Sequence, residues 1–142
     1  VTIAHGDYRI GNVMFHPTES KMIAVLDWEL CTIGHPLADV AYNCMYDLMA
    51  VSSSAPPIDR NAMPGIPTVE EHVANYCKQA GRDRIENLNF YLAFSMFRLA
   101  SISQGVYKRG LDGNASSERA MTLGDACATL SNAAWDLVQK PD

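Results

Sequence analysis

The chain has 142 residues, of which 48% are hydrophobic and 19% are charged, a composition typical of a single globular domain. Its formal net charge of -5 argues against a protein that binds by neutralising nucleic-acid phosphates or an anionic membrane surface. No stretch approaches the roughly 20 apolar residues of a membrane span, and the four cysteines have neither disulfide-framework nor zinc-site spacing. We therefore expect a cytoplasmic protein with no nucleic-acid and no membrane partner.

The sequence opens with an apolar segment instead of Met, and the motif HGDYRIGN begins already at His5. A loop motif of this kind normally has more protein before it. We interpret the chain as a piece of a longer protein. A processed or trimmed complete domain is the alternative.

Two short runs rich in apolar, β-forming residues come next. Residues 12–17 (NVMFHP) and residues 22–27 (MIAVLD) are separated by the polar TESK. This pattern predicts a β-hairpin.

A helix is expected from about residue 36 to 50, because apolar residues recur at helical spacing and Pro36 suits a first helical turn. Residues 51–67 contain four prolines and a serine run, which predicts a long loop that is mobile or borders a substrate site. Thr68, followed three residues later by a glutamate, is the signature of a capping box. It predicts a helix over 69–80 that the following glycine ends.

One apolar stripe predicts a long third helix from Asp83 to near Gly110. Its members are Ile85, Leu88, Leu92, Met96, Leu99, Ile102 and Val106. After a turn over 111–116, Ser116 or Ser117 can cap a last helix that runs to about residue 139. The expected fold is therefore mainly α with a small β-hairpin.

The spacing of Asp7 and Asn12 indicates phosphoryl-transfer chemistry. In such a site an aspartate accepts a hydroxyl proton, and an asparagine amide oxygen five residues later binds Mg²⁺. The same template requires a second metal-binding aspartate at the end of a later strand, and Asp27 in VLDWE occupies that position. An isolated loop aspartate more often only orders a turn. The joint pattern, and not any one residue, carries the interpretation.

The segments HGDYRIGN, VLDWE and IGHPLADVAY resemble the aminoglycoside phosphotransferase and choline-kinase superfamily. Over nearly its whole length the chain resembles, more narrowly, the phosphotransferase-like domain associated with acyl-CoA dehydrogenases. The resemblance implies that residues 1–142 form the C-terminal catalytic lobe of a protein-kinase-like (α+β) fold. It also implies that the N-terminal lobe, with its phosphate-covering loop and lysine, is absent from this chain.

The resemblance assigns roles to the residues that match its motifs. Asp7 corresponds to the catalytic base, and Asn12 and Asp27 correspond to the ligands of Mg²⁺ and of the nucleotide phosphates. Arg9 lies two residues beyond the base, where it either faces the moving phosphoryl group or is a solvated surface residue.

Three further residues are expected to act indirectly. His5 is expected to support the loop and not to carry protons, and Asp39 is expected to accept hydrogen bonds from the catalytic loop. Arg98 is the one charge in the apolar run FSMFRLAS. Because an unpaired buried charge is costly, we expect it to meet a carboxylate or to reach the substrate groove.

The function that the resemblance implies is ATP-dependent, Mg²⁺-assisted phosphoryl transfer to a hydroxyl of a small molecule. The acceptor would be an aminoglycoside-like sugar or a hydroxyacyl-CoA-type metabolite. The expected partners are the missing lobe and an acyl-CoA dehydrogenase domain or neighbour, so that the isolated chain would be inactive. The alternative is a catalytically silent lobe that serves as a binding or interaction module.

Overall fold

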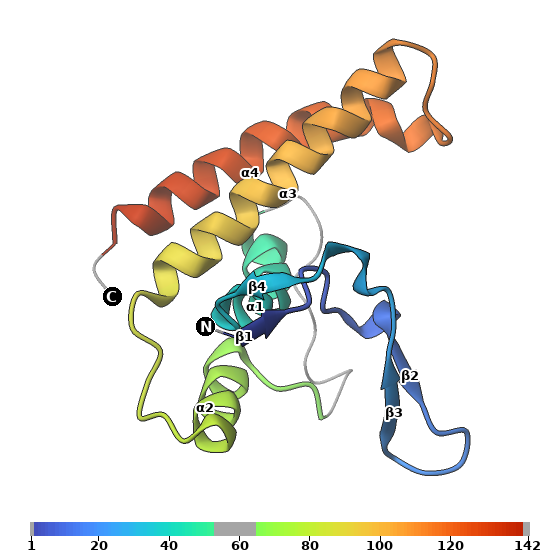
Figure 1. Cartoon of the computed structure of the whole chain (residues 1–142). Helices are drawn as coiled ribbons and strands as arrows, with labels where there is room; N and C mark the ends of the chain where they lie inside the picture. The colour runs from blue at the N-terminus through green and yellow to red at the C-terminus, as the bar shows by residue number, and fades with distance from the viewer. Residues whose placement is uncertain (1, 53–64, 141–142) are drawn as a thin grey trace.

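A computed structural model describes residues 2–52 and 65–140 of the chain (Figure 1). Two small antiparallel sheets precede a group of helices. The strands are β1 (Thr2–Ala4), β2 (Val13–Phe15), β3 (Met22–Val25) and β4 (Thr32–Gly34), and the helices are α1 (Leu37–Ser52), α2 (Val69–Ala80), α3 (Leu88–Leu111) and α4 (Leu123–Val138). Short 3-10 helices lie at Ile10–Asn12, Trp28–Leu30 and Glu118–Thr122.

The predicted hairpin is confirmed: β2 and β3 pair antiparallel, with Val13 opposite Val25. A second pairing was not predicted. β1 lies antiparallel to β4, with Thr2 opposite Gly34 and Ala4 opposite Thr32. Because β1 leads into the expected catalytic loop (residues 5–9) and β4 leads into α1, this sheet holds the loop beside the start of α1 (Figure 1).

Helix α1 lies at the centre of the core. One side of it packs against α2 and the start of α3, in a cluster that includes Leu37, Cys44, Cys77, Ile85 and Leu92. Another side packs on α3 and α4, in a cluster of Tyr42, Met45, Ala93, Met96 and Ala134. Helices α3 and α4 run side by side as a long pair (Figure 1). Burial on two sides fixes α1, and with it any residue that α1 presents to the catalytic loop.

Two of the predicted helices agree closely with the structure. Helix α1 begins at Leu37, directly after Pro36. Helix α2 has the predicted capping box, because Glu71 N donates to Thr68 Oγ1 at 3.2 Å and Thr68 N donates to Glu71 Oε2 at 2.8 Å. Gly81 ends α2 in the left-handed conformation, with φ 64°.

The predicted start of the third helix at Asp83 is wrong. Helix α3 begins at Leu88, after Asn87 adopts φ 56°, which is incompatible with a continuous helix. Ile85 matched the apolar stripe because it is buried in the core as part of the connecting segment. In the last connection, Ser117 accepts a hydrogen bond from Arg119 N and caps the 3-10 helix Glu118–Thr122, and α4 follows only from Leu123.

The fold is thus mostly helical with small antiparallel sheets, as expected. The expected loop over 51–67 falls largely on residues 53–64, which lie outside the described residues. No helix in the described part of the chain is long and apolar enough to cross a membrane. The assignment to the C-terminal lobe of a kinase-like fold stays a prediction.

Thr68→Ala should lower the free energy of unfolding by about 1 kcal/mol, because the amide of Glu71 loses its capping acceptor. Chemical denaturation followed by circular dichroism measures the change. Ser116→Ala, at an exposed position before the cap of the next element, is the control and should change stability by less than about 0.5 kcal/mol. Equal midpoints for Thr68→Ala and wild type would contradict the role of the box.

Candidate active site

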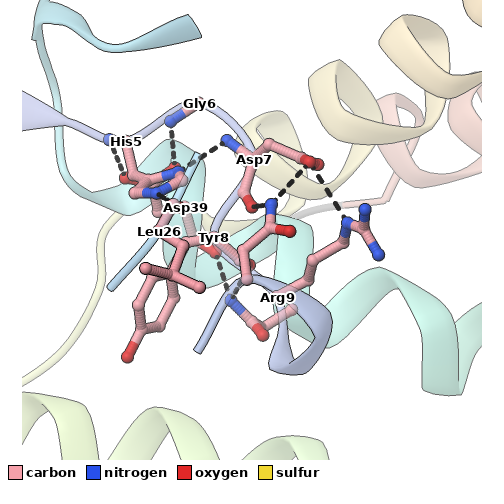
Figure 2. Close-up of polar contacts among 9 residues, drawn as sticks. His5, Gly6, Asp7, Tyr8, Arg9, Leu26 and Asp39 are labelled. Carbon is pink, nitrogen blue, oxygen red and sulfur yellow. Dashed lines mark hydrogen bonds and ion pairs between the residues drawn. The ribbon is translucent and has the colours of Figure 1, made fainter. Parts of the chain in front are cut away.

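The carboxylate of Asp39 holds the catalytic loop from the first turn of α1. His5 N donates to Asp39 Oδ2 at 2.7 Å, and Gly6 N donates to Asp39 Oδ1 at 2.9 Å (Figure 2). Both carboxylate oxygens therefore bind consecutive backbone N–H groups. This arrangement fixes the direction in which the chain enters the loop.

His5 holds the next part of the loop with its side chain. Asp7 N donates to His5 Nδ1 at 3.2 Å, so Nδ1 carries no proton, and Nε2–H donates to the carbonyl oxygen of Leu26 at 2.9 Å (Figure 2). The ring is buried and also lies against Trp28, with 4.6 Å between ring centroids. Because both ring nitrogens have structural partners, the geometry favours a supporting role for His5.

Asp7 and Asn12 are joined directly. Asn12 Nδ2 donates to Asp7 Oδ2 at 2.8 Å and to the backbone oxygen of Asp7 at 2.9 Å. Asn12 is buried, and its amide orientation turns the carbonyl oxygen Oδ1 away from Asp7. The asparagine therefore fixes the aspartate with its nitrogen and leaves its oxygen available for another ligand.

Arg9 lies beside the same carboxylate. Arg9 Nε donates to Asp7 Oδ2 at 3.1 Å, and the Arg9 side chain is about half exposed (Figure 2). A Cβ on Gly11 would lie 2.8 Å from Arg9 Nη1, so the glycine leaves the space that the guanidinium occupies. The structure thus places Arg9 in the loop next to the expected base.

The pKa of the Asp7 carboxyl lies below its ordinary value of 3.8. Burial is the largest single effect and raises the pKa, but the hydrogen bonds from Arg9, Asn12 and Tyr42 and the charge of Arg9 together outweigh it. Because the folded-state pKa is lowered, the stabilisation from this group is present above the unfolded value and is lost as the pH falls through the folded value. Asp7 is a carboxylate at neutral pH.

Asp27 reaches the site through the β2–β3 hairpin. Leu26 N donates to the backbone oxygen of Asn12 at 2.8 Å. Asp27, the next residue, is therefore placed near Asn12. Asp27 has φ 66° and ψ 55°, the left-handed region that few residues other than glycine adopt and that often occurs at functional sites. Its side chain is exposed and has no hydrogen-bond or ion-pair partner among the described residues.

The donor set of this site fits a magnesium ion. Asn12 Oδ1 and the Asp27 carboxylate are oxygen ligands of the kind that Mg²⁺ prefers, and Mg²⁺ usually keeps several water or phosphate ligands besides one or two protein groups. Within the described part of the chain, no cluster of three or more His, Cys, Asp or Glu residues could hold a metal by itself. The expected ligands therefore suit an ion that is bound together with phosphates.

The two loops of the site contact each other at Gly6. Gly6 has φ 84°, and a Cβ there would lie 2.5 Å from the carbonyl oxygen of Leu30. A glycine is required at this position because both the backbone conformation and the space exclude a side chain. The segment that follows Asp27 is in this way fixed against the loop that carries Asp7.

Two contacts from α1 were not foreseen. Asn43 Nδ2 donates to the backbone oxygen of Tyr8 at 2.8 Å, and the side chain of Tyr42 contributes to the lowered pKa of Asp7. The sequence did contain an indication of these contacts, because the spacing of Asp39, Tyr42 and Asn43 places them on one face of a helix. The guanidinium of Arg98 lies 5.1 Å from the centre of the Tyr42 ring, and no ion pair with a carboxylate is found for it among the described residues. A cation over an aromatic face needs no carboxylate. The other expectation, that Arg98 reaches the substrate groove, stays a prediction.

A loop with a paired aspartate and asparagine, joined to a hairpin that ends in an exposed aspartate, defines a phosphotransferase-like class of protein. The comparison with protein families agrees: residues 1–77 match the model of the "Phosphotransferase enzyme family". The chain belongs to this family.

Solved and curated proteins are similar over almost the whole chain. A crystal structure of a provisionally assigned aminoglycoside phosphotransferase from Ralstonia eutropha superposes with a TM-score of 0.84 and 44% identity, covering 99% of this chain and 43% of that protein. Acyl-CoA dehydrogenase family member 10 of mouse is 47% identical over 98% of this chain, and human family member 11 is 41% identical over 97%. The chain spans only 13% and 18% of the length of these two relatives.

Asp39→Ala should lower the free energy of unfolding by about 1–3 kcal/mol, because two backbone N–H groups lose their acceptors. Urea denaturation of the 142-residue chain measures the change. Asp112→Ala removes an exposed carboxylate that pairs only with Lys108 and should cost less than about 1 kcal/mol. If the Asp39 variant unfolds at the wild-type midpoint, Asp39 does not hold the loop.

Proposed function

We propose that this chain carries the catalytic loop and the metal ligands of an ATP-dependent, Mg²⁺-assisted small-molecule kinase. The observation that carries the proposal is the direct hydrogen bond of 2.8 Å between Asn12 and Asp7, with Asp27 brought beside Asn12 by the hairpin. The membership of the phosphotransferase family and the aminoglycoside phosphotransferase-like neighbour support it.

In the proposed reaction Asp7 accepts the proton of the acceptor hydroxyl and orients its oxygen toward the γ-phosphorus. Asn12 keeps the carboxylate in place with Nδ2. Arg9 is close enough to Asp7 to stabilise charge on the transferred group. Asn12 Oδ1 and the Asp27 carboxylate would hold Mg²⁺, which when bound neutralises the charge of the phosphates.

The nucleotide requires more than these three residues. Asp7, Asn12 and Asp27 offer acceptor oxygens to an anionic ligand, so without a metal ion they would repel it. In the kinase scheme a lysine and a covering loop from a second lobe hold the phosphates. We therefore propose that residues 1–142 work as the C-terminal lobe of a two-lobed unit within a longer polypeptide.

Two acceptor classes remain in the proposal. An aminoglycoside-like sugar matches the name of the structural neighbour. A hydroxyacyl-CoA-type metabolite matches the names of the acyl-CoA dehydrogenase relatives. Both similarities extend over nearly the whole chain at comparable identity, so both acceptor classes are tested. A screen of both classes with the longer protein, with ATP consumption as the readout, identifies the acceptor.

In the longer protein, Asp7→Asn should lower turnover roughly a hundredfold or more, because an amide cannot accept the hydroxyl proton. The affinity for MgATP should change little, since Asp7 does not belong to the proposed metal ligands. Steady-state rates on the acceptor found in the screen measure the effect. Asp112→Asn, a matched change on the surface, should be neutral. Turnover of the Asp7 variant within threefold of wild type refutes the base assignment.

The 142-residue chain alone should bind MgATP weakly and show no phosphoryl transfer. Its ligands would hold only the phosphate end of the nucleotide and would leave the adenine uncovered. Isothermal titration calorimetry of the chain with MgATP measures the affinity. A dissociation constant in the low micromolar range, on the order of -7 to -8 kcal/mol, would mean that these residues contain a complete nucleotide site and would overturn the two-lobed proposal.

A further inference from the structure

Helix α1 contacts the catalytic loop at a second place, beyond Asp7 in the chain. Asn43 Nδ2 donates to the backbone oxygen of Tyr8 at 2.8 Å. Asp39, one helical turn earlier, accepts the N–H groups of the two residues that precede Asp7. The same helix therefore binds the loop backbone directly before Asp7 and directly after it.

The side-chain amide of Asn43 is oriented by its own helix. Besides the bond to Tyr8, Nδ2 donates to the backbone oxygen of Asp39 at 3.0 Å. Both atoms that face Nδ2 are carbonyl oxygens, which can only accept hydrogen bonds, so the group that faces them is the NH2 of the amide and not its oxygen. Each hydrogen of this NH2 group has one acceptor. The helix thus directs a partly buried donor toward the loop.

Other contacts of the backbone at Asp7 are made within the loop and the turn that follows it. The N–H of Asp7 donates to His5 Nδ1 at 3.2 Å, and its backbone oxygen accepts from Asn12 Nδ2 at 2.9 Å. These partners belong to the same short segment as Asp7, so they move with it when the segment moves. Asn43 belongs to a helix that is buried on two sides. Its bond to Tyr8 connects the peptide group after Tyr8 to the core.

That peptide group leads directly to Arg9. Arg9 Nε donates to Asp7 Oδ2 at 3.1 Å. A rotation of the peptide group would move the backbone of Arg9 relative to Asp7 and disturb this contact. Precise placement of the reacting groups is the main requirement of phosphoryl transfer.

We propose that Asn43 is a positioning residue for phosphoryl transfer, because its amide fixes the carbonyl of Tyr8 and thereby the orientation of Asp7 and Arg9. The inference rests on the proposed function, since it takes Asp7 as the group that receives the proton. The role differs from that of Asp39, which holds the loop where the chain enters it. With one contact on each side of Asp7, the loop cannot rotate about either contact alone.

The proposed metal ligands are anchored by a different element. Leu26 N donates to the backbone oxygen of Asn12 at 2.8 Å, which ties Asn12 to the hairpin that also carries Asp27. Loss of the Asn43 contact should therefore lower kcat and leave the affinity for MgATP nearly unchanged.

The test uses the longer protein with MgATP, with water as the phosphate acceptor and phosphate release as the readout. Asn43→Ala removes the donor and should lower kcat about tenfold, the scale of one hydrogen bond. Isothermal titration calorimetry should give a dissociation constant and a stoichiometry for MgATP within about twofold of wild type. Asn132→Ala, at an exposed position of α4, is the matched control and should leave all three quantities unchanged.

A second variant separates the donor from the volume of the side chain. Asn43→Asp keeps the size of the residue but turns an ionised oxygen toward the two carbonyl oxygens, so kcat should fall at least as far as in Asn43→Ala. If Asn43 served only to fill space, the aspartate would retain more activity than the alanine. Where only one of the two variants folds, its kcat relative to wild type decides.

The outcomes separate the two proposals, with Asp7→Asn as the reference for loss of the base. If Asp7→Asn abolishes phosphate release while the Asn43 variants keep kcat within twofold of wild type, the positioning role is overturned and the proposed function stands. If Asp7→Asn has no effect, the proposed function fails and this inference fails with it.

Three further results would assign Asn43 a purely structural role and overturn the inference. The first is a loss of MgATP affinity or stoichiometry in Asn43→Ala as large as the loss of kcat. The second is wild-type kcat in Asn43→Asp together with a low kcat in Asn43→Ala. The third is failure of both variants to fold.

Discussion

The hydrogen bonds that two consecutive backbone N–H groups donate to the Asp39 carboxylate are the contacts on which the site depends. They are made by a helix whose other sides are buried, since Ala41 and Met45 of α1 are completely inaccessible. The catalytic loop has no regular secondary structure of its own over residues 5–9. Its shape is therefore determined by a few side-chain contacts to α1 and to the hairpin, and the packing of α1 is transmitted directly to the site.

The side chains around Asp7 fix the position of its carboxylate and lower its basicity. Arg9 and Asn12 donate to its carboxylate, and the lowered pKa makes Asp7 a weaker base than an unperturbed aspartate. In the proposed reaction the transition state is loose and catalysis rests mainly on positioning and electrostatic stabilisation, so a weak base costs little. Donors that hold the carboxylate in one orientation contribute more to the rate than a higher basicity would. The same donors ensure that the group is ionised at any physiological pH.

Much of the fold could be predicted from local signals. The capping box at Thr68 and Glu71, the hairpin and the first residue of α1 each follow from residues that lie close together in the sequence. The β1–β4 pairing could not be predicted in this way, because its strands have three residues each and lie far apart in the chain. The start of α3 was misplaced because Ile85 continues the apolar period by chance while it packs as part of a loop.

The site could be predicted to a similar extent. Motif spacing identified the residues that share the loop and the strand end, and the structure brings Asp7 and Asn12 into direct contact. The contact of Tyr42 with Arg98 was beyond that reasoning, because the sequence does not distinguish an aromatic residue in an apolar helix from ordinary core packing. A charge on α3 likewise gives no sign of which ring it will meet.

The contact between Arg98 and Tyr42 joins two parts of the chain that differ in how they match known proteins. The family model covers residues 1–77, which include both loops, α1 and most of α2, but neither α3 nor α4. Identity to the acyl-CoA dehydrogenase relatives continues through α3 and α4. The family model thus covers the part of the chain that contains Asp7, Asn12, Asp27 and Asp39. Arg98 lies in the second part, on α3, and its guanidinium lies over the ring of Tyr42 on α1, in the first part. The helix pair of α3 and α4 is thus in contact with the helix whose Asp39 holds the backbone of residues 5 and 6.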